Sequence, residues 1–152
     1  DDFLRITDRK KDIIVTAGGK NIAPQPIENS VKTNKYVSQA VMIGDKRKFP
    51  LLLVVPNWDQ LERWAGQQNI IWTQRSQLLE MPTIHMKMEK EVRSQLTGLA
   101  SFETPKKIGL LEHDFSVERG ELTPTLKVKR RVIDRDYKAL IDSLYAEPRA
   151  GA

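Results

Sequence analysis

The hydrophobic pattern at the start of the chain predicts two short strands and a short helix. The strands cover residues 3–7 and 12–16, flank a charged run, and precede the turn signal Gly18-Gly19. Pro24 and Pro26 suit the first turn of a helix, where a missing N–H costs little, and apolar residues at helical spacing continue to about Thr33. The chain is therefore expected to open with a hairpin-like unit and a short helix.

Two apolar runs in the middle of the chain predict an antiparallel pair of strands at the centre of a sheet. They cover residues 37–43 and 51–55, and the second run is continuously apolar, which indicates burial on both faces. The loop between them carries Lys46, Arg47 and Lys48. This run of cations is interpreted as a solvated hairpin loop.

The following segment has helical periodicity. Three tryptophans and Leu61 fall on helices within residues 57–80. A longer helix follows, because apolar residues recur at every fourth position: Ile84, Met88, Val92 and Leu96. An apolar stripe at this spacing is typical of any amphipathic helix, so these aromatic and methionine side chains are interpreted as core.

The last third of the chain predicts one more strand and a final helix. The strand covers residues 107–112, Gly120 marks a turn, and residues 123–131 form a polar, basic loop. Asp134 is expected to cap the helix, whose apolar face consists of Tyr137, Leu140, Ile141 and Leu144. With a frayed tail at 148–152, the pattern predicts an α+β fold, a small and mostly antiparallel sheet with packed helices.

Composition narrows the class of protein. With 152 residues, 39% of them hydrophobic and 30% charged, the chain is expected to form one domain over residues 1–152. It has no cysteine, no long apolar run and no signal pattern at its start, so a cytoplasmic location is expected. Its two histidines are far apart, which predicts no metal site. The net charge of +5 favours anionic partners without choosing among them.

Two basic segments are the candidates for chemistry. The first contains residues 8–12 and the Gly18-Gly19-Lys20 turn, whose backbone could approach a phosphate. The second, residues 120–131, could extend a lysine outward toward a carboxylate or phosphate oxygen. Taken separately, either segment could equally be a solvated basic face. The first is not a Walker loop, since Ile14 and Asn21 occupy positions where that motif requires glycine and serine or threonine.

Taken in order, these segments resemble the C-terminal domain of the adenylate-forming superfamily, in particular that of AMP-forming long-chain fatty-acid–CoA ligases. The resemblance covers nearly the whole chain. It rests on three stretches: Asp8-Arg9-Lys10-Lys11-Asp12, Ile43-Gly44-Asp45-Lys46-Arg47, and Gly120-Glu121-Leu122-Thr123-Pro124-Thr125-Leu126-Lys127. The turn at Gly18 and the Pro-x-x-x-Glu helix start that ends at Glu28 are also similar to this family.

The resemblance implies roles for individual residues. Lys127 would be the catalytic lysine of adenylation and would contact the nucleotide, and Arg9 would bind the ribose. Lys11, flanked by Asp8 and Asp12, would be the hinge. The Gly18-Gly19-Lys20 loop would line the CoA tunnel, and the choice between the two glycines stays open because the loop is one residue longer than usual.

The same resemblance implies substrates and partners. ATP with Mg²⁺, a fatty acid and CoA would bind mainly to a large N-terminal domain of the same polypeptide, which this sequence lacks, so the isolated chain is expected to be inactive. Peripheral membrane association is a further expectation. Two alternatives stay open, a fatty-acyl-AMP ligase that serves a carrier protein and a non-catalytic basic binding module. Nucleic acid is disfavoured as a ligand, because no aromatic residues interleave with the cations from Lys127 to Arg131.

Overall fold

A computed structural model describes residues 13–124 and 128–146 of the chain. Its centre is a three-stranded sheet in the order β3-β4-β5, formed by Val37–Ile43, Leu51–Pro56 and Lys107–Leu110. The β3 and β4 strands pair antiparallel, as predicted, whereas β5 pairs parallel to β4. The prediction that both middle strands are central is wrong for β3, because among the described strands of this sheet β4 has a neighbour on each side and β3 lies at the edge.

The central strand separates two hydrophobic clusters. All six residues of β4 are buried, as its continuous apolar run predicted. Leu52 and Val54 contribute to one cluster, whereas Leu51, Leu53 and Val55 contribute to the other. This alternation is the period-2 geometry of a strand that is covered on both faces.

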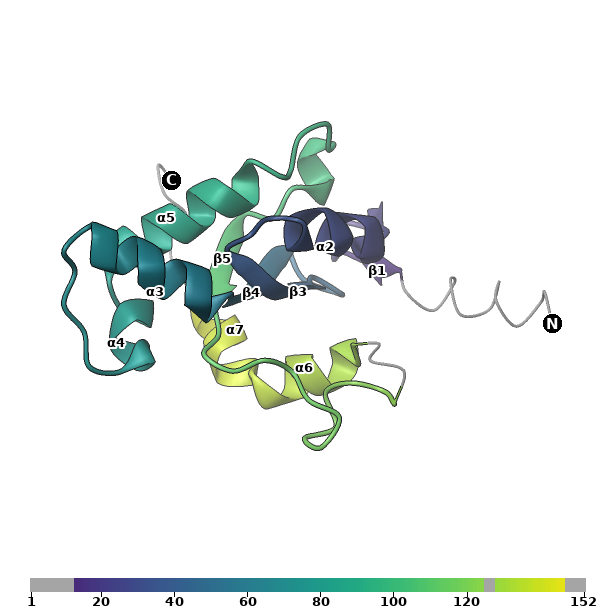
Figure 1. The fold of residues 1–152 in the computed structure, drawn as a ribbon. Helices are drawn as coiled ribbons and strands as arrows, with labels where there is room; N and C mark the ends of the chain where they lie inside the picture. The colour runs from purple at the N-terminus through teal and green to yellow at the C-terminus, as the bar shows by residue number, and fades with distance from the viewer. Residues whose placement is uncertain (1–12, 125–127, 147–152) are drawn as a thin grey trace.

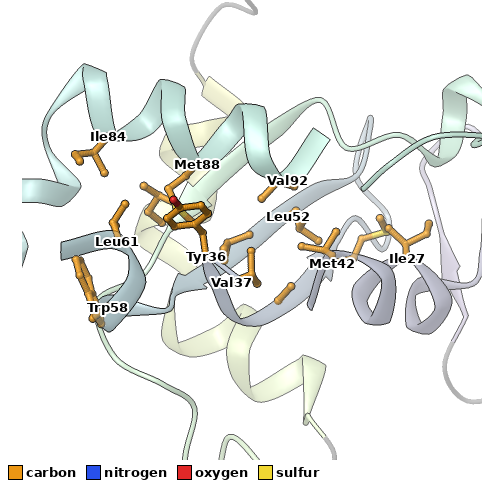
Figure 2. Close-up of a cluster of buried hydrophobic side chains, with 14 of the residues drawn as sticks. Ile27, Tyr36, Val37, Met42, Leu52, Trp58, Leu61, Ile84, Met88 and Val92 are labelled. Atoms are coloured by element: carbon orange, nitrogen blue, oxygen red, sulfur yellow. The ribbon is translucent and has the colours of Figure 1, made fainter. Parts of the chain in front are cut away.

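The first cluster lies between one face of the sheet and the helices that precede β5; Figure 1 shows these helices and Figure 2 shows side chains of the cluster. These helices are α2 (Pro24–Lys32), α3 (Trp58–Gln67), α4 (Arg75–Leu79) and α5 (Pro82–Arg93). The predicted stripe on the longest helix is confirmed, since Ile84, Met88 and Val92 are fully buried. Leu96 lies beyond the end of α5 and is only partly buried. A single 3-10 turn, η1 (Ser101–Glu103), lies between α5 and β5.

The second cluster is covered by α6 (Arg130–Asp136) and α7 (Lys138–Ala146), on the opposite side of the sheet in Figure 1. Ile133 and Ile141 are fully buried, and the other predicted apolar positions of the last helix pack against them. The cap predicted at Asp134 is wrong. The helix begins at Arg130, so Asp134 lies inside it, and its carboxylate is occupied by a contact with Arg47.

A two-stranded hairpin precedes α2. Its strands are β1 (Ile14–Val15) and β2 (Asn21–Ile22), which pair antiparallel across the glycine turn. The predicted strand at 12–16 thus has its partner after the turn, whereas the partner predicted at 3–7 lies outside the described residues. The start of α2 at Pro24 and its end next to Thr33 are as predicted. Within the described residues, every helix is too short or too polar to cross a membrane.

Candidate functional site

The predicted site residues are unequally covered by the structure. The proposed hinge and ribose ligand, Asp8, Arg9, Lys11 and Asp12, lie outside the described residues, as does Lys127. The proposed tunnel loop, Gly18-Gly19-Lys20, is described in full. The described parts of the candidate site are therefore that loop and the residues directly before 125 and after 127.

The glycine turn joins β1 to β2 and is closed by three hydrogen bonds to Thr16. The Thr16 amide donates to the carbonyl of Lys20 at 3.0 Å, and its own carbonyl accepts from the Gly19 amide at 2.9 Å. The Thr16 hydroxyl oxygen accepts from the Lys20 amide at 3.2 Å. Gly19 has φ +84°, a conformation that other residues adopt only with strain, whereas Gly18 has no positive φ. The turn itself thus requires glycine at 19 but not at 18.

The segments before and after residues 125–127 are joined by short-range pairing. Leu122 and Val128 form an antiparallel bridge, and the Lys129 amide donates to the carbonyl of Glu121 at 2.8 Å. The paired residues 121–122 and 128–129 form a stem. Val128, the sequence neighbour of Lys127, is therefore held in a defined position.

The side chain of Glu121, a residue of this stem, ends in a buried carboxylate. It accepts hydrogen bonds from the Ser116 amide at 3.0 Å, from Arg119 Nε at 3.2 Å and from the Tyr137 hydroxyl at 3.3 Å. Burial, together with the Glu121 charge, raises the pKa of Tyr137, so this hydroxyl remains a hydrogen-bond donor. The three donors stabilise the carboxylate and tie the stem to α6 and to the preceding turn.

A second buried carboxylate, Glu28 of α2, reaches across the edge strand β3 to α6. It accepts from the Met42 amide at 2.6 Å and from Arg130 Nη1 at 2.5 Å, and Arg130 also donates to the Met42 carbonyl at 3.1 Å. The two side chains thus satisfy both polar backbone groups that Met42 presents at the edge of the sheet. Glu28 ends the Pro-x-x-x-Glu helix start and Arg130 belongs to the basic segment 120–131, and no pattern in the sequence indicates that the two are paired.

The loop between β3 and β4 is not simply solvated, so this interpretation is wrong for Arg47. Its Nη2 lies 3.2 Å from Asp134 of α6, and its Nη1 lies 3.2 Å from Asp142 of α7. Its guanidinium lies 5.0 Å from the ring centroid of Tyr145. Hydrogen bonds from Lys138 and Arg47 hold the pKa of Asp142 below its usual value, and burial raises the pKa of Tyr145.

The two candidate segments meet at a small cavity of about 190 Å³. One wall comes from the hairpin and the loop after β3, and the other from the first turns of α6. The lining residues are Ile13, Ile14, Ile43, Gly44, Asp45, Arg130, Arg131 and Asp134. The structure therefore places the beginning of the glycine hairpin beside the helix that follows Lys127. The described residues contain no cluster of three or more potential metal ligands.

Solved adenylation domains share this fold. The adenylation domain of a carboxylate reductase from Mycobacterium chelonae matches 91% of this chain with a TM-score of 0.73 at 24% identity, over 20% of its own length. The corresponding domain from Segniliparus rugosus, in complex with AMP and a carboxylic acid, matches 91% of the chain with a TM-score of 0.71 at 21% identity, also over 20% of its length. The predicted α+β class is confirmed.

Residues 11–97 match the family described as the AMP-binding enzyme C-terminal domain, and the chain belongs to this family. It is 37% identical to the long-chain-fatty-acid–CoA ligase FadD15 of Mycobacterium tuberculosis over 95% of its length, and 35% identical to the human long-chain-fatty-acid–CoA ligase ACSBG1 over 97%. The chain spans only 24% and 23% of these two proteins. The resemblance inferred from the sequence is thereby confirmed.

Proposed function

We propose that this chain works as the C-terminal domain of a longer, AMP-forming long-chain fatty-acid–CoA ligase. The observation that carries the proposal is its similarity, over nearly its whole length, to two proteins named as such ligases. In the first reaction a fatty-acid carboxylate attacks the α-phosphorus of ATP, and pyrophosphate leaves. In the second, the CoA thiol loses its proton and attacks the acyl carbon, and AMP leaves with the electrons of the acyl–oxygen bond.

In the first reaction, Lys127 would donate hydrogen bonds to the carboxylate and α-phosphate oxygens as charge redistributes. The residues that follow Lys127 are held in the stem, since Val128 bridges to Leu122 and the Lys129 amide donates to the Glu121 carbonyl. Arg9 would bind the ribose. Mg²⁺ would neutralise the phosphates of ATP and would bind with ATP mainly to the N-terminal domain of the proposed longer protein.

In the second reaction the domain would turn about Lys11, between Asp8 and Asp12, and present the Gly18-Gly19-Lys20 loop to the CoA pantetheine. Gly19 is explained by its own φ of +84°, whereas Gly18 has no positive φ and no described residue would contact a β-carbon there. We therefore assign Gly18 as the tunnel glycine, where a β-carbon would narrow the path of the thiol. A membrane-peripheral, cytoplasmic location would bring such a ligase to its lipid substrate.

The proposal is tested with the full-length protein and its Lys127→Ala variant. Palmitate-dependent exchange between ATP and pyrophosphate is expected to fall by about 10²–10³, the cost of removing a preorganised donor. Formation of palmitoyl-CoA from supplied palmitoyl-AMP should be largely kept. Unchanged exchange would remove Lys127 from the mechanism, and acyl transfer to a carrier protein but not to CoA would identify a fatty-acyl-AMP ligase.

A further inference from the structure

Arg47 connects the glycine hairpin to the C-terminal helices. Its side chain lies between α6 and α7, where its two terminal nitrogens each contact a different carboxylate at 3.2 Å, that of Asp134 and that of Asp142. Its side chain is 25% exposed, so water screens these contacts only in part. A planar guanidinium can make both contacts at once, which an ammonium group cannot do with the same geometry.

The backbone around Arg47 holds the hairpin. The carbonyl of Arg47 accepts from the Ala17 amide at 2.8 Å, directly before Gly18. The Lys46 amide donates to the Val15 carbonyl at 2.8 Å, and the Asp45 carboxylate accepts from the Val15 amide at 3.1 Å. The loop after β3 therefore contacts the hairpin through the backbone of Lys46 and Arg47 and through the Asp45 carboxylate. The same loop contacts both C-terminal helices through the Arg47 side chain.

The glycine turn is exposed at residues 17–20, while Ile14 and Ile22 anchor the base of the hairpin in the core. Beyond the hairpin, the Ala17 amide donates to the Arg47 carbonyl, and Lys20 Nζ lies 5.5 Å from the ring centroid of Phe102. The backbone of the turn is thus joined to the rest of the domain at Arg47. The stem beside Lys127 is held by other contacts, the Leu122–Val128 bridge and buried Ile133.

From this geometry we infer that Arg47 is a positioning residue for the Gly18-Gly19 turn and so acts in the transfer of the acyl group to CoA. The inference rests on the proposed function. Because the Arg47 carbonyl contacts the turn directly, whereas its side chain reaches the lysine stem only through Asp134 of α6, loss of Arg47 should affect the thioester-forming reaction much more than adenylation. A residue that served only the stability of the domain would affect both reactions together.

The test compares Arg47→Ala, Arg47→Lys and Lys48→Ala in the full-length protein. Lys48 is an exposed cation of the same loop that makes no ion pair with a described residue, so its removal changes the net charge equally. Single-turnover formation of palmitoyl-CoA from palmitoyl-AMP is expected to fall about 10- to 100-fold in Arg47→Ala, the effect of a turn displaced by about 1 Å. Arg47→Lys should recover part of this loss, and Lys48→Ala should match the wild type.

Two further measurements separate the inference from the proposed function. Exchange of ATP with pyrophosphate should stay within about twofold of wild type in Arg47→Ala, because the Leu122–Val128 bridge of the stem is kept. Hydrogen exchange of the peptide containing Ala17 should be about tenfold faster in this variant, because the Arg47 carbonyl that accepts from the Ala17 amide is no longer held by contacts with α6 and α7. If wild type forms no palmitoyl-CoA, the proposed function fails, while the exchange at Ala17 still tests the link. Equal losses in both reactions, or unchanged exchange at Ala17, would overturn the inference.

Discussion

The pair formed by Glu28 and Arg130 should contribute strongly to stability, and Glu28→Ala measures that contribution. The Glu28 side chain is only 7% exposed and that of Arg130 only 19%. Removal of Glu28 takes away the carboxylate that lies 2.5 Å from Arg130 Nη1 and leaves the Met42 amide without this acceptor. Breaking a buried ion pair on one side costs about 3–5 kcal/mol, and the partial exposure of Arg130 favours the lower end of that range.

The chosen assay is urea unfolding of the 152-residue chain, followed by tryptophan fluorescence. With a loss of about 3 kcal/mol and a slope of about 2 kcal/mol per molar urea, the midpoint should fall by about 1.5 M. Glu28→Gln keeps the shape and an acceptor oxygen but loses the charge. It should therefore lie between wild type and Glu28→Ala.

Glu89→Ala is the matched control, since it removes another helical glutamate paired with an arginine. Glu89 contacts Arg93 one turn away, and its side chain is 53% exposed. An exposed pair of this kind contributes about 0.3–0.5 kcal/mol. If Glu28→Ala destabilises the chain no more than Glu89→Ala, the buried pair does not stabilise the edge of the sheet as argued here.

Three further changes test the packing and the charges. Gly109→Ala would place its β-carbon 2.8 and 2.9 Å from two leucine methyl groups and should cost about 1–3 kcal/mol in thermal unfolding; a neutral result would mean that β5 and α7 can separate freely. Met88→Ala should cost about 2–5 kcal/mol by urea unfolding, whereas Met86→Ala, at a position 72% exposed, should cost less than about 0.5 kcal/mol. For Glu91, a hydrogen bond from Asn34 is the main cause of a lowered pKa. The stability from this bond is present above pH 4.5 and is lost as the pH falls through the lowered pKa, so Glu91→Gln should flatten the acid limb of a stability profile.

The local pattern of the sequence was sufficient for most elements. Strands β3 and β4 follow from continuous aliphatic runs, and the buried face of α5 follows from apolar residues at every fourth position. The short strand β2 was missed, because Asn21-Ile22 is too brief to show alternation and pairs only through the turn. The parallel pairing of β5 was also not predicted, since it depends on contacts between segments more than fifty residues apart along the chain.

The partners of the charged residues could not be predicted from the sequence. One rule, that runs of cations face solvent, led to the interpretation of Lys46-Arg47-Lys48 and to one of the two alternatives left open for the basic run that ends at Arg131. It holds for Lys46, Lys48 and Lys129, which are exposed. It is wrong for Arg47 and Arg130, whose carboxylate partners are about ninety or a hundred residues away along the chain. A local sequence pattern carries no information about partners that are so far away along the chain.

In both runs the residue that turns inward is an arginine between two exposed cations. The reason is the shape of its head group, which can donate to two acceptors in one plane. Arg47 uses it to join Asp134 and Asp142, and Arg130 uses it to join Glu28 and the Met42 carbonyl. Both arginines thereby connect α6 to the part of the domain that contains the hairpin, α2 and β3. The glycine turn and the stem beside Lys127 are thus attached to one connected framework, as a domain that rotates as a unit would require.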